Sequence, residues 1–510
     1  MNYADLFRMT LPETALEIAA LVVLVVDLGF LRRATLRVRV FVASILGVFG
    51  CGAAIVAMTL QPPGGLGYPG SKDLLLSSGG YAAAAQAGIL VLTVFTLFLF
   101  IEADFTRHAA EFVAVILMAA TGGLLIAAAQ DLLVIFVGLE LLSLGLYILT
   151  AFAKKSGKSA EGALKYYLFG GMSAAFLLFG FSYLYGLAGS TNLHQIMLAM
   201  YGPNAVNATP LLYVALVMIT AGLGFKVAAV PFHLWAPDAY EGAPAPAAAF
   251  IASVSKVASF ALLIGIGTAA SHVFGEAQAV KVSAEFSVNP PAKFIGFQGP
   301  WSVILTLVSV ASMALGNLAA LAQTSVRRLL AYSAIAHAGY ILLALAYFSH
   351  SPVSTNAVLY YILTYGLTTI GAFGAVAMVE RASGSDRMDA FLGLSKRSPL
   401  LAAVLMVLFL SLAGIPPLVG FWAKFNLFAA VLQVTAGVVP FTLVALAVGM
   451  SAVSLYYYLQ VLKRVYVMPA VDDSPIVGHP ITMGVLILIA LAVLILGCLP
   501  ALLQTWIAGF

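Results

Sequence analysis

The sequence predicts an all-α polytopic membrane protein with about 14 transmembrane helices, and three observations support this fold class. Of the 510 residues, 62% are hydrophobic and only 9% are charged, whereas soluble domains carry about 25% charged residues. Apolar runs long enough to cross a bilayer, about 20 residues each, follow one another along the chain. Most lysines and arginines lie in every second connection between these runs, as expected for a chain that crosses a membrane repeatedly.

Turn residues and charges end each apolar run and so define the predicted helices. In chain order, we expect membrane-spanning helices over residues 11–31, 38–60, 78–101, 111–129, 131–153, 162–187, 209–231, 243–271, 301–322, 327–348, 353–380, 399–434, 438–463 and 480–507. The seventh helix contains Pro231, and the twelfth is too long for one straight span and contains Pro416 and Pro417. Because proline lacks the N–H that continues a helix, we predict that helices 7 and 12 are broken.

The predicted helices also suggest an internal repeat. Helices four to eight and nine to thirteen form two five-helix units, and each unit has a buried lysine near a proline break. Two consecutive units with an odd number of spans must be inverted relative to each other, and inverted repeats with broken helices are typical of transporters. We therefore expect an N-terminal region of three helices, a first repeat, an extramembrane loop, a second, inverted repeat and a C-terminal helix, over residues 1–110, 111–271, 272–300, 301–463 and 464–510.

The basic residues predict the orientation of the chain. Lysines and arginines such as Arg32, Lys154 and Arg381 gather in the loops that follow odd-numbered helices. Since cytoplasmic loops carry the excess of basic residues, we expect both termini on the periplasmic side of a bacterial inner membrane. Glu13 and Glu17 in the first apolar run favour a retained helix over a cleaved signal peptide.

The composition gives no sign of a cofactor in this chain. Its two cysteines, Cys51 and Cys498, lie far apart in apolar runs and are too few for a zinc site or an iron–sulfur cluster. The sequence contains no phosphate-binding loop and no dinucleotide fingerprint. The net charge of +4 comes from loops beside helices and does not indicate nucleic-acid binding. We therefore expect any energy source to lie outside this chain.

Charged residues inside the predicted helices carry the functional signal: Glu140, Lys165, Lys226, Lys256 and Lys424. Placing such a charge in hydrocarbon costs about 2.5–3.5 kcal/mol on insertion scales, and intramembrane charges usually mark ion paths. We therefore expect the chain to move protons or cations. The structural alternatives are a fixed ion pair between Glu140 and Lys165, snorkelling of Lys165 to the membrane surface, and packing of Lys256 among serines.

Lys226 is the strongest single candidate for a proton-carrying residue. Pro231 has no N–H, so the carbonyl of Val227 loses its helical partner and needs a water or a side chain instead. Burial disfavours the charged form of an ionisable group. A buried lysine beside a free carbonyl and water can therefore take up and release a proton.

The break in the twelfth helix repeats this chemistry. Pro416 and Pro417 free the carbonyls of Leu412 and Ala413, which can hold water in an otherwise dry bundle. Lys424 follows this break by about two helical turns. We expect Lys424 to be the terminal site of a relay.

Two histidines are secondary candidates. His233 follows the first break directly and can link Lys226 to the cytoplasmic side, or it can simply lie at the interface beside Trp235. His337 lies well inside the tenth predicted helix. It is placed to bridge the two halves of the chain between Lys256 and Lys424.

Two segments carry a strong resemblance to a known family. Residues 224–244 read GFKVAAVPFHLWAPDAYEGAP, and residues 323–340 read QTSVRRLLAYSAIAHAGY. Both are similar to signatures of the antiporter-like membrane subunits of proton-pumping NADH:quinone oxidoreductase, which is respiratory complex I. Among these subunits the chain most resembles the N type, because residues 163–170 (ALKYYLFG), residues 186–193 (GLAGSTNL) and Lys424 look like that type.

The resemblance implies a role for each intramembrane charge. Glu140 and Lys165 would be the coupling pair, Lys226 the central relay, Lys256 the connector and Lys424 the exit. It also implies that flavin and iron–sulfur clusters lie in partner subunits and that the membrane neighbours are an M-type subunit and small membrane subunits. The function implied is redox-driven proton translocation.

Other functions are compatible with the same motifs. A subunit of a multisubunit Na⁺/H⁺ antiporter shares them. A second alternative is an energy-converting hydrogenase or a quinone complex with another electron donor. A structural membrane scaffold without its own proton path is an alternative of a different class. It predicts that neutralising the buried lysines leaves pumping intact.

Overall fold

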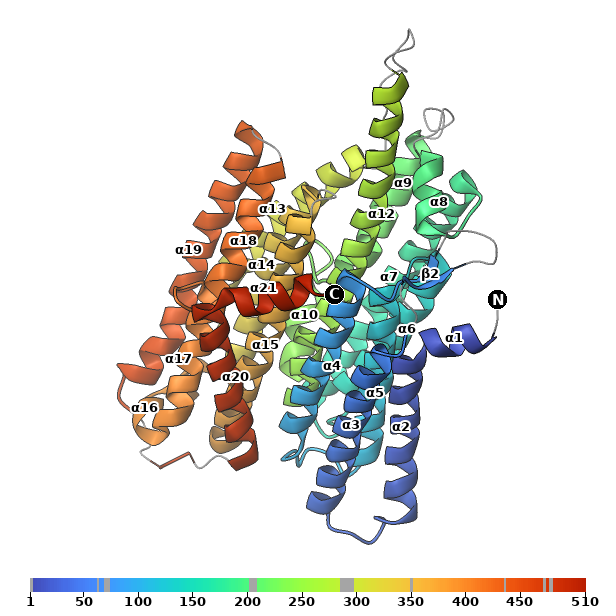
Figure 1. The fold of residues 1–510 in the computed structure, drawn as a ribbon. Coiled ribbons are helices and arrows are strands. Elements are labelled where there is room, and N and C mark those ends of the chain that lie inside the picture. The colour runs from blue at the N-terminus through green and yellow to red at the C-terminus, as the bar shows by residue number, and fades with distance from the viewer. Residues whose placement is uncertain are drawn as a thin grey trace.

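The computed structural model describes residues 3–61, 64–67, 74–200, 209–284, 298–348, 352–434, 437–470, 474–476 and 480–510. These parts are helical (Figure 1), apart from an antiparallel pair of short strands, β1 (Leu66–Gly67) and β2 (Leu74–Leu76). Among the described residues, 11 helices are long and apolar enough to cross a membrane. The predicted fold class, a helical multi-span membrane protein, is therefore confirmed.

The helices follow the predicted runs closely. The first part of the chain forms α1 (Tyr3–Met9), α2 (Leu11–Gly29), α3 (Leu36–Met58), α4 (Tyr81–Phe100), α5 (Ala109–Ala128), α6 (Leu132–Thr150), α7 (Gly157–Ala188), α8 (Leu193–Met200), α9 (Thr209–Lys226), α10 (Trp235–Gly242), α11 (Ala245–Ala252) and α12 (Val254–Ala284). The second part forms α13 (Gln298–Leu321), α14 (Val326–Ala346), α15 (Pro352–Ser383), the 3₁₀-helix η2 (Met388–Phe391), α16 (Leu394–Arg397), α17 (Pro399–Ala413), α18 (Val419–Val434), α19 (Val438–Tyr466), α20 (Pro480–Cys498) and α21 (Pro500–Ala508).

Both predicted breaks are present. The seventh run divides into α9 and α10, and the twelfth divides into α17 and α18. Two further interruptions were not predicted: Ser253 separates α11 from α12, and α21 turns away from α20 at Leu499 (Figure 1). The second of these precedes Pro500, whose missing N–H favours a new helix start.

The predicted domain boundaries stay a prediction, with one observation at the predicted loop over residues 272–300. The α12 helix continues through Ala284, and α13 begins at Gln298. The helix therefore extends into the segment that we expected to be a loop. Residues 285–297 lie outside the described residues.

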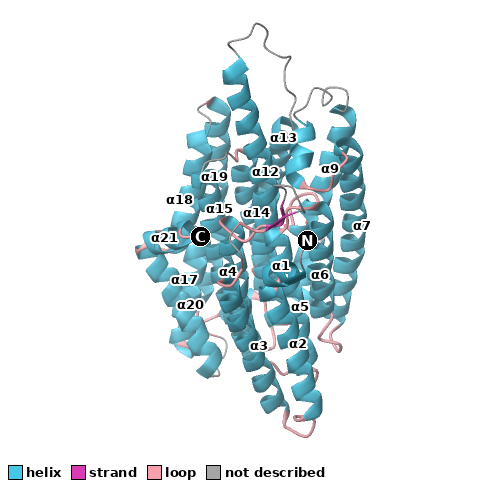
Figure 2. Cartoon of the chain, turned by 45° about the vertical axis from the view of Figure 1, so that its right-hand side comes forward, coloured by secondary structure: helices cyan, strands magenta, loops and turns pink. Residues whose placement is uncertain are grey.

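The chain forms two groups of helices that meet along α15. Figure 1 shows α2 to α9 and α12 mainly on the right and α16 to α20 on the left, with α10, α14 and α15 between them, and Figure 2 shows the same helices from a second side. The α15 helix packs against α4, α11 and α12 of the first group, and α10 packs against α14 of the second. The candidate site residues lie on helices around this junction.

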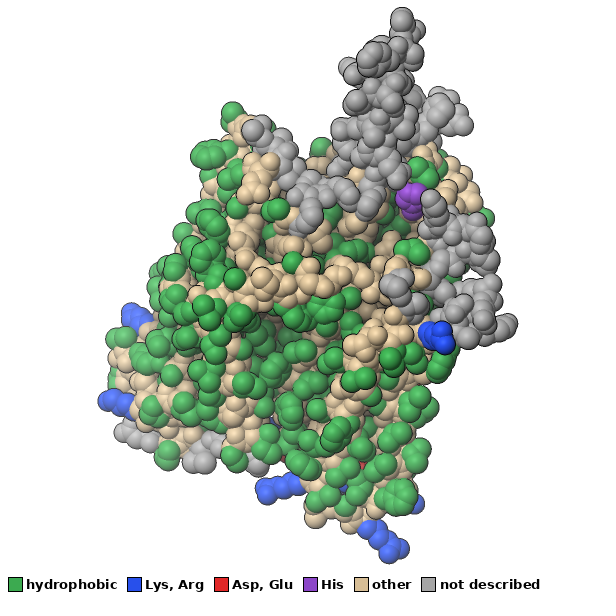
Figure 3. All heavy atoms as spheres, in the orientation of Figure 1, with side chains coloured by type: hydrophobic (Ala, Val, Ile, Leu, Met, Phe, Trp, Pro, Cys, Tyr) green, Lys and Arg blue, Asp and Glu red, His purple; other side chains and the backbone are tan. Residues whose placement is uncertain are grey.

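The surface fits a membrane environment. Figure 3 shows hydrophobic side chains over most of the visible face, with most of the visible lysines and arginines at the lower end. We call this the basic end; it carries the loops of Arg32, Lys154, Arg381 and Lys396. Among the 11 candidate spans of the described residues, α19 and α20 are the least covered by the rest of the chain, with 22% and 28% of their most apolar window buried. These two helices therefore offer their sides to lipid or to partner subunits.

Candidate functional site

Three of the predicted lysines are deeply buried. The exposed fraction is 7% for Lys226, 2% for Lys256 and 6% for Lys424. Glu140 and Lys165 are only partly buried, with side-chain exposures of 28% and 38%. The structure thus separates a buried set of lysines from a more accessible pair.

Glu140 faces Lys226. The Lys226 ammonium lies 3.9 Å from Oε1 of Glu140 and donates a hydrogen bond to Oγ of Ser143 at 2.5 Å. Glu140 and Ser143 are three residues apart on α6, so they share one face of that helix. Lys226 is the last residue of α9, at the break, which brings its side chain to this face.

The expected pair of Glu140 and Lys165 is wrong for this structure. The Lys165 ammonium lies 2.6 Å from Glu161 and 2.7 Å from Asp238. Glu161 is one helical turn earlier on α7, and Lys165 lies only about two turns from the start of that helix at the basic end. Its long side chain therefore reaches the carboxylates of that end, which is the snorkelling alternative.

The first break frees a carbonyl as predicted, but a different lysine binds it. Ala228 takes a left-handed conformation, with φ of 55°, and this ends the helical hydrogen bonding. The carbonyl of Val227 accepts a hydrogen bond from Lys256 of α12. The carbonyl of Phe225 accepts one from the indole of Trp235 at 3.0 Å. Lys256 is therefore fixed to the break rather than merely packed among serines.

The second break holds Lys424 in the same way. Its ammonium donates to the carbonyl of Ala413 at 2.8 Å and to Oγ of Ser451 at 2.7 Å. The lysine stem folds back over Gly414, where a Cβ would lie 2.9 Å from Cδ of Lys424. Gly414 also has φ of 90°, which side chains disfavour. Glycine at this position therefore permits both the helix end and the approach of the lysine.

His337 lies in the neighbourhood of both lysines of the breaks, and its predicted bridging role stays a prediction. It is buried on α14, and it is near enough to both Lys256 and Lys424 for their charges to interact. Its Nδ1 is 2.7 Å from the hydroxyl of Tyr361. His337 and Tyr361 also border a cavity of about 10 Å³, which is about the space that one water needs.

His233 lies in the turn between α9 and α10. Its ring is buried, and its Nδ1 has no hydrogen-bond partner within the described part of the chain. Among the described residues, no hydrogen bond or ion pair joins His233 to Lys226. Its predicted linking role stays a prediction.

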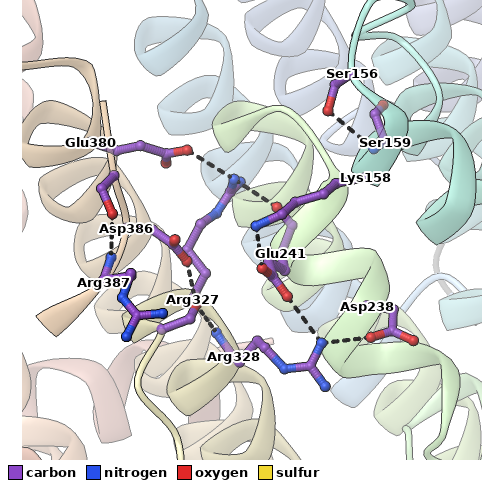
Figure 4. A network of polar contacts seen from close by, with 12 residues as sticks. Ser156, Lys158, Ser159, Asp238, Glu241, Arg327, Arg328, Glu380, Asp386 and Arg387 are labelled. Atoms are coloured by element: carbon purple, nitrogen blue, oxygen red, sulfur yellow. Dashed lines mark hydrogen bonds and ion pairs between the residues drawn. The ribbon is translucent and has the colours of Figure 1, made fainter. Parts of the chain in front are cut away.

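An ion-pair network at the basic end was missed by the sequence reasoning (Figure 4). Asp238 of α10 binds Lys165 at 2.7 Å and Arg328 of α14 at 2.6 Å. Glu241, one turn later, binds Lys158 at 2.7 Å and the same Arg328 at 3.0 Å. Each carboxylate thus joins α7 to α14 across the junction of the two helix groups.

The basic partners of Asp238 and Glu241 lower the pKa of both carboxyls. Burial raises the pKa of Asp238, but hydrogen bonds from Lys165 and Arg328 lower it by more. Burial likewise raises the pKa of Glu241, and hydrogen bonds from Lys158 and Arg328 outweigh it. The pKa of each carboxyl is therefore below its usual value, and both are ionised at neutral pH.

Arg327 adds a second link between the same helices. Its guanidinium donates to the carbonyls of Glu241 at 3.0 Å and Ala243 at 2.6 Å, at the end of α10. The signal was present in the sequence, because two acids follow the first break and two adjacent arginines open α14. Only the fold shows that these segments meet.

No group of three or more His, Cys, Asp or Glu side chains that could hold a metal ion occurs among the described residues. The site consists of three buried lysines whose ammonium groups donate to backbone carbonyls or serine hydroxyls, with Glu140 beside Lys226. Such an arrangement of ionisable groups can pass protons between neighbours.

Sequence comparison shows which proteins this chain is similar to. Residues 129–283 and 264–451 match the family described as NADH:quinone oxidoreductase/Mrp antiporter, transmembrane. The chain is 46% identical to NADH-quinone oxidoreductase subunit N 2 of Acidobacterium capsulatum, with 99% of both chains covered. It is 36% identical to subunit N of Anaeromyxobacter sp., with 95% of this chain and 93% of that one covered.

Solved structures show the same fold. A chain of respiratory complex I from Thermus thermophilus with bound aureothin is 31% identical, with a TM-score of 0.75 over 97% of this chain and 98% of that one. A chain of the Mrp complex from Dietzia sp. is 20% identical, with a TM-score of 0.75 over 96% of this chain and 95% of that one. At 20% identity, the second likeness concerns the fold alone.

Proposed function

Because the chain belongs to the subunit N family of NADH-quinone oxidoreductase, an H⁺-translocating complex, we propose that its buried lysines carry protons across the membrane. One observation carries this proposal. Each proline-containing break frees a backbone carbonyl, and a buried lysine donates to it: Lys256 to Val227 and Lys424 to Ala413. A carbonyl dipole supports the ammonium without neutralising it, so the lysine stays responsive to neighbouring charges.

The proposed path runs from Lys226 through Lys256 and His337 to Lys424. Like charges in a medium of low dielectric repel strongly, so a proton that arrives at one site disfavours protonation of the next. His337 interacts electrostatically with both lysines of the breaks, and its Tyr361 partner and adjacent cavity offer a hydroxyl and room for a water. Beyond the Glu140–Lys226 ion pair, a proton can therefore pass from Lys256 through His337 to Lys424 without a salt bridge to break.

Glu140 is the proposed control element of the path. Its carboxylate lies 3.9 Å from Lys226, close enough to favour the charged lysine. Any displacement of Glu140 weakens this support and releases the Lys226 proton toward its neighbours. The redox reaction would act on the chain through such a displacement.

The inverted repeat remains part of the proposal. Both breaks bind a lysine, and both halves contain a very close helix pair. A Cβ at Gly122 of α5 would lie 2.5 Å from the backbone nitrogen of Leu142, and one at Gly316 of α13 would lie 2.6 Å from that of Ala336. Close helix pairs of this kind depend on small residues.

Orientation and partners complete the proposal. The basic end faces the cytoplasm by the positive-inside rule, and both termini are periplasmic in a bacterial inner membrane. Flavin and iron–sulfur clusters lie in partner subunits, with no cofactor in this chain. An M-type antiporter-like subunit and small membrane subunits are its neighbours in the bilayer.

The test uses the intact complex in inverted membrane vesicles. Lys226→Ala and Lys424→Ala should each reduce NADH-driven acidification sharply, while a native gel shows normal assembly. Lys154→Ala removes an exposed lysine of the basic end and is the matched control. Normal acidification in an assembled Lys226→Ala complex would favour a structural scaffold instead.

A further inference from the structure

The ammonium of Lys424 has an aromatic neighbour as well as its two oxygen acceptors. It lies over the ring of Tyr340 on α14, 5.5 Å from the ring centroid. A lysine ammonium carries three N–H groups, and two of them donate to Ala413 and Ser451. Among the described residues, no third oxygen accepts a hydrogen bond from this ammonium. A cation within about 6 Å of an aromatic face is attracted by the negative charge of that face, and most strongly where water is excluded.

The hydroxyl of Tyr340 holds this ring in place. Nδ2 of Asn317 on α13 donates to that hydroxyl at 2.9 Å and to the carbonyl of Met313 at 2.8 Å. Oδ1 of Asn317 accepts from the hydroxyl of Tyr457 on α19 at 3.2 Å. Asn317 and both tyrosines are fully buried, and both donors and the oxygen of the amide have partners. A buried network with all its groups satisfied is rigid, so α13 and α19 together fix the position of the Tyr340 ring.

The ring of Tyr340 also contacts the histidine of the proposed path. His337 lies three residues earlier on α14, and the two rings meet edge to face with centroids 5.8 Å apart. Residues with this spacing share one face of a helix. The ring of Tyr340 therefore touches both His337 and Lys424, whereas its hydroxyl is bound by Asn317.

We propose that Tyr340 is a positioning residue for proton transfer at Lys424, with the face of its ring supporting the ammonium and Asn317 holding the ring in place. This inference rests on the proposed function, because Tyr340 acts through Lys424. The face of the ring attracts the charged ammonium but has no comparable attraction for the neutral amine. It also has no lone pair on which a proton could settle. Tyr340 thus favours the protonated lysine without competing for its proton.

The first test separates the ring from the hydroxyl in the intact complex. Tyr340→Leu removes the aromatic face and should lower NADH-driven acidification of inverted vesicles about tenfold, which corresponds to about 1.4 kcal/mol and is within the range of a desolvated cation–π contact. Tyr340→Phe keeps the face and should retain most of the acidification. Equal losses in the two variants, with assembly shown by a native gel, would overturn the inference.

The second test changes the charge of the ring face and hardly changes its shape. Mono-, di- and trifluorinated phenylalanine are placed at position 340, and each added fluorine withdraws electron density from the face. Acidification should fall stepwise along this series. The same residues at Phe112 are the matched control, because this buried ring of α5 stacks on Phe100 and no ammonium lies over it among the described residues.

The fluorinated series also decides the matter if Tyr340→Leu does not assemble. Equal acidification by all members of the series at position 340 would overturn the role of the ring. Lys424→Ala is measured beside them. A loss of acidification in Lys424→Ala, together with a flat series, would leave the proposed function standing without Tyr340.

Discussion

At the scale of single residues, the central feature is a lysine that donates to a carbonyl at a helix break. Neither Lys256 nor Lys424 has a carboxylate partner among the described residues. A salt bridge would hold such a charge in place, whereas a carbonyl and a hydroxyl hold it more weakly. The protonation of these lysines can therefore follow the charges around them.

The hydroxyl of Ser451 should help to stabilise the charged form of Lys424. Ser451→Ala removes one of the two acceptors of its ammonium, and a hydrogen bond to a charged group contributes about 1.5–3 kcal/mol. The charged lysine becomes less favourable, so NADH-driven acidification should fall several-fold while assembly is normal. Ser454→Ala is the control, because its hydroxyl donates to the backbone carbonyl of Ser451 rather than to the lysine. Equal effects of the two variants would count against a role for this contact.

The freed carbonyls could be predicted from the sequence, whereas the side chains that bind them could not. Proline chemistry is local, so the loss of partners at Val227 and Ala413 was predictable from the sequence. The residue that donates to the Val227 carbonyl is Lys256, which comes from another helix. The sequence suggested Lys226 instead, because Lys226 is the neighbour of Val227 in the chain. Lys165 was misassigned for a related reason, since its partner Asp238 lies on α10, after the break.

At the scale of elements, the helix breaks, more than the long helices, determine where the buried lysines find their hydrogen-bond acceptors. The α9 and α17 helices end inside the bundle, and the short connections that follow place unpaired backbone groups where the lysines can reach them. Irregular backbone at membrane depth is tolerated only where protein or water satisfies it. Most of the predicted helix boundaries agree with the structure because apolar runs and prolines are themselves the physical cause of the helices and their ends; the exceptions are the interruptions at Ser253 and Leu499 and the extension of α12 to Ala284.

Gly414 gives a prediction about the second break. Gly414→Ala places a Cβ against the stem of Lys424 at a φ of 90°, which costs an L-residue about 1–2 kcal/mol. The lysine must shift from the Ala413 carbonyl, so acidification should drop while the complex still assembles. Gly449→Ala on α19 is the control, since a Cβ there meets nothing within 4 Å. If Gly414→Ala pumped as well as the control, the position of Lys424 would not matter.

At the scale of the whole molecule, α10 and α15 join the two helix groups. The carboxylates of α10 bind α7 and α14 together at the basic end, and α15 packs against both groups. These contacts link segments far apart in sequence, which is why the network was not predicted. Composition and periodicity determine which segments are helices, but not which charges meet across them.

The network should act as one unit. Asp238→Asn and Arg328→Gln should each lower the thermal midpoint of complex dissociation by about 2 °C. The double variant should lose less than the sum, with a coupling of about 1 kcal/mol, because the residues share one interaction. The pKa of Asp238 is lowered in the fold, so its contribution is fully present above its ordinary pKa of about 4 and is lost only as the pH falls further. Dissociation at pH 7 therefore reports the whole contribution of Asp238. Strictly additive losses in the double variant would argue against an interaction between Asp238 and Arg328. Lys155→Gln, at an exposed lysine, is the control.

The most direct test of the account is proton pumping by a Lys226→Arg complex. Arginine keeps the positive charge beside Glu140 and Ser143 but does not release its proton at physiological pH. We expect an assembled complex whose NADH-driven acidification in inverted vesicles falls to near the level of Lys226→Ala. Acidification at the wild-type rate would show that only a fixed positive charge is needed at this position, and it would contradict proton transfer through the buried lysines.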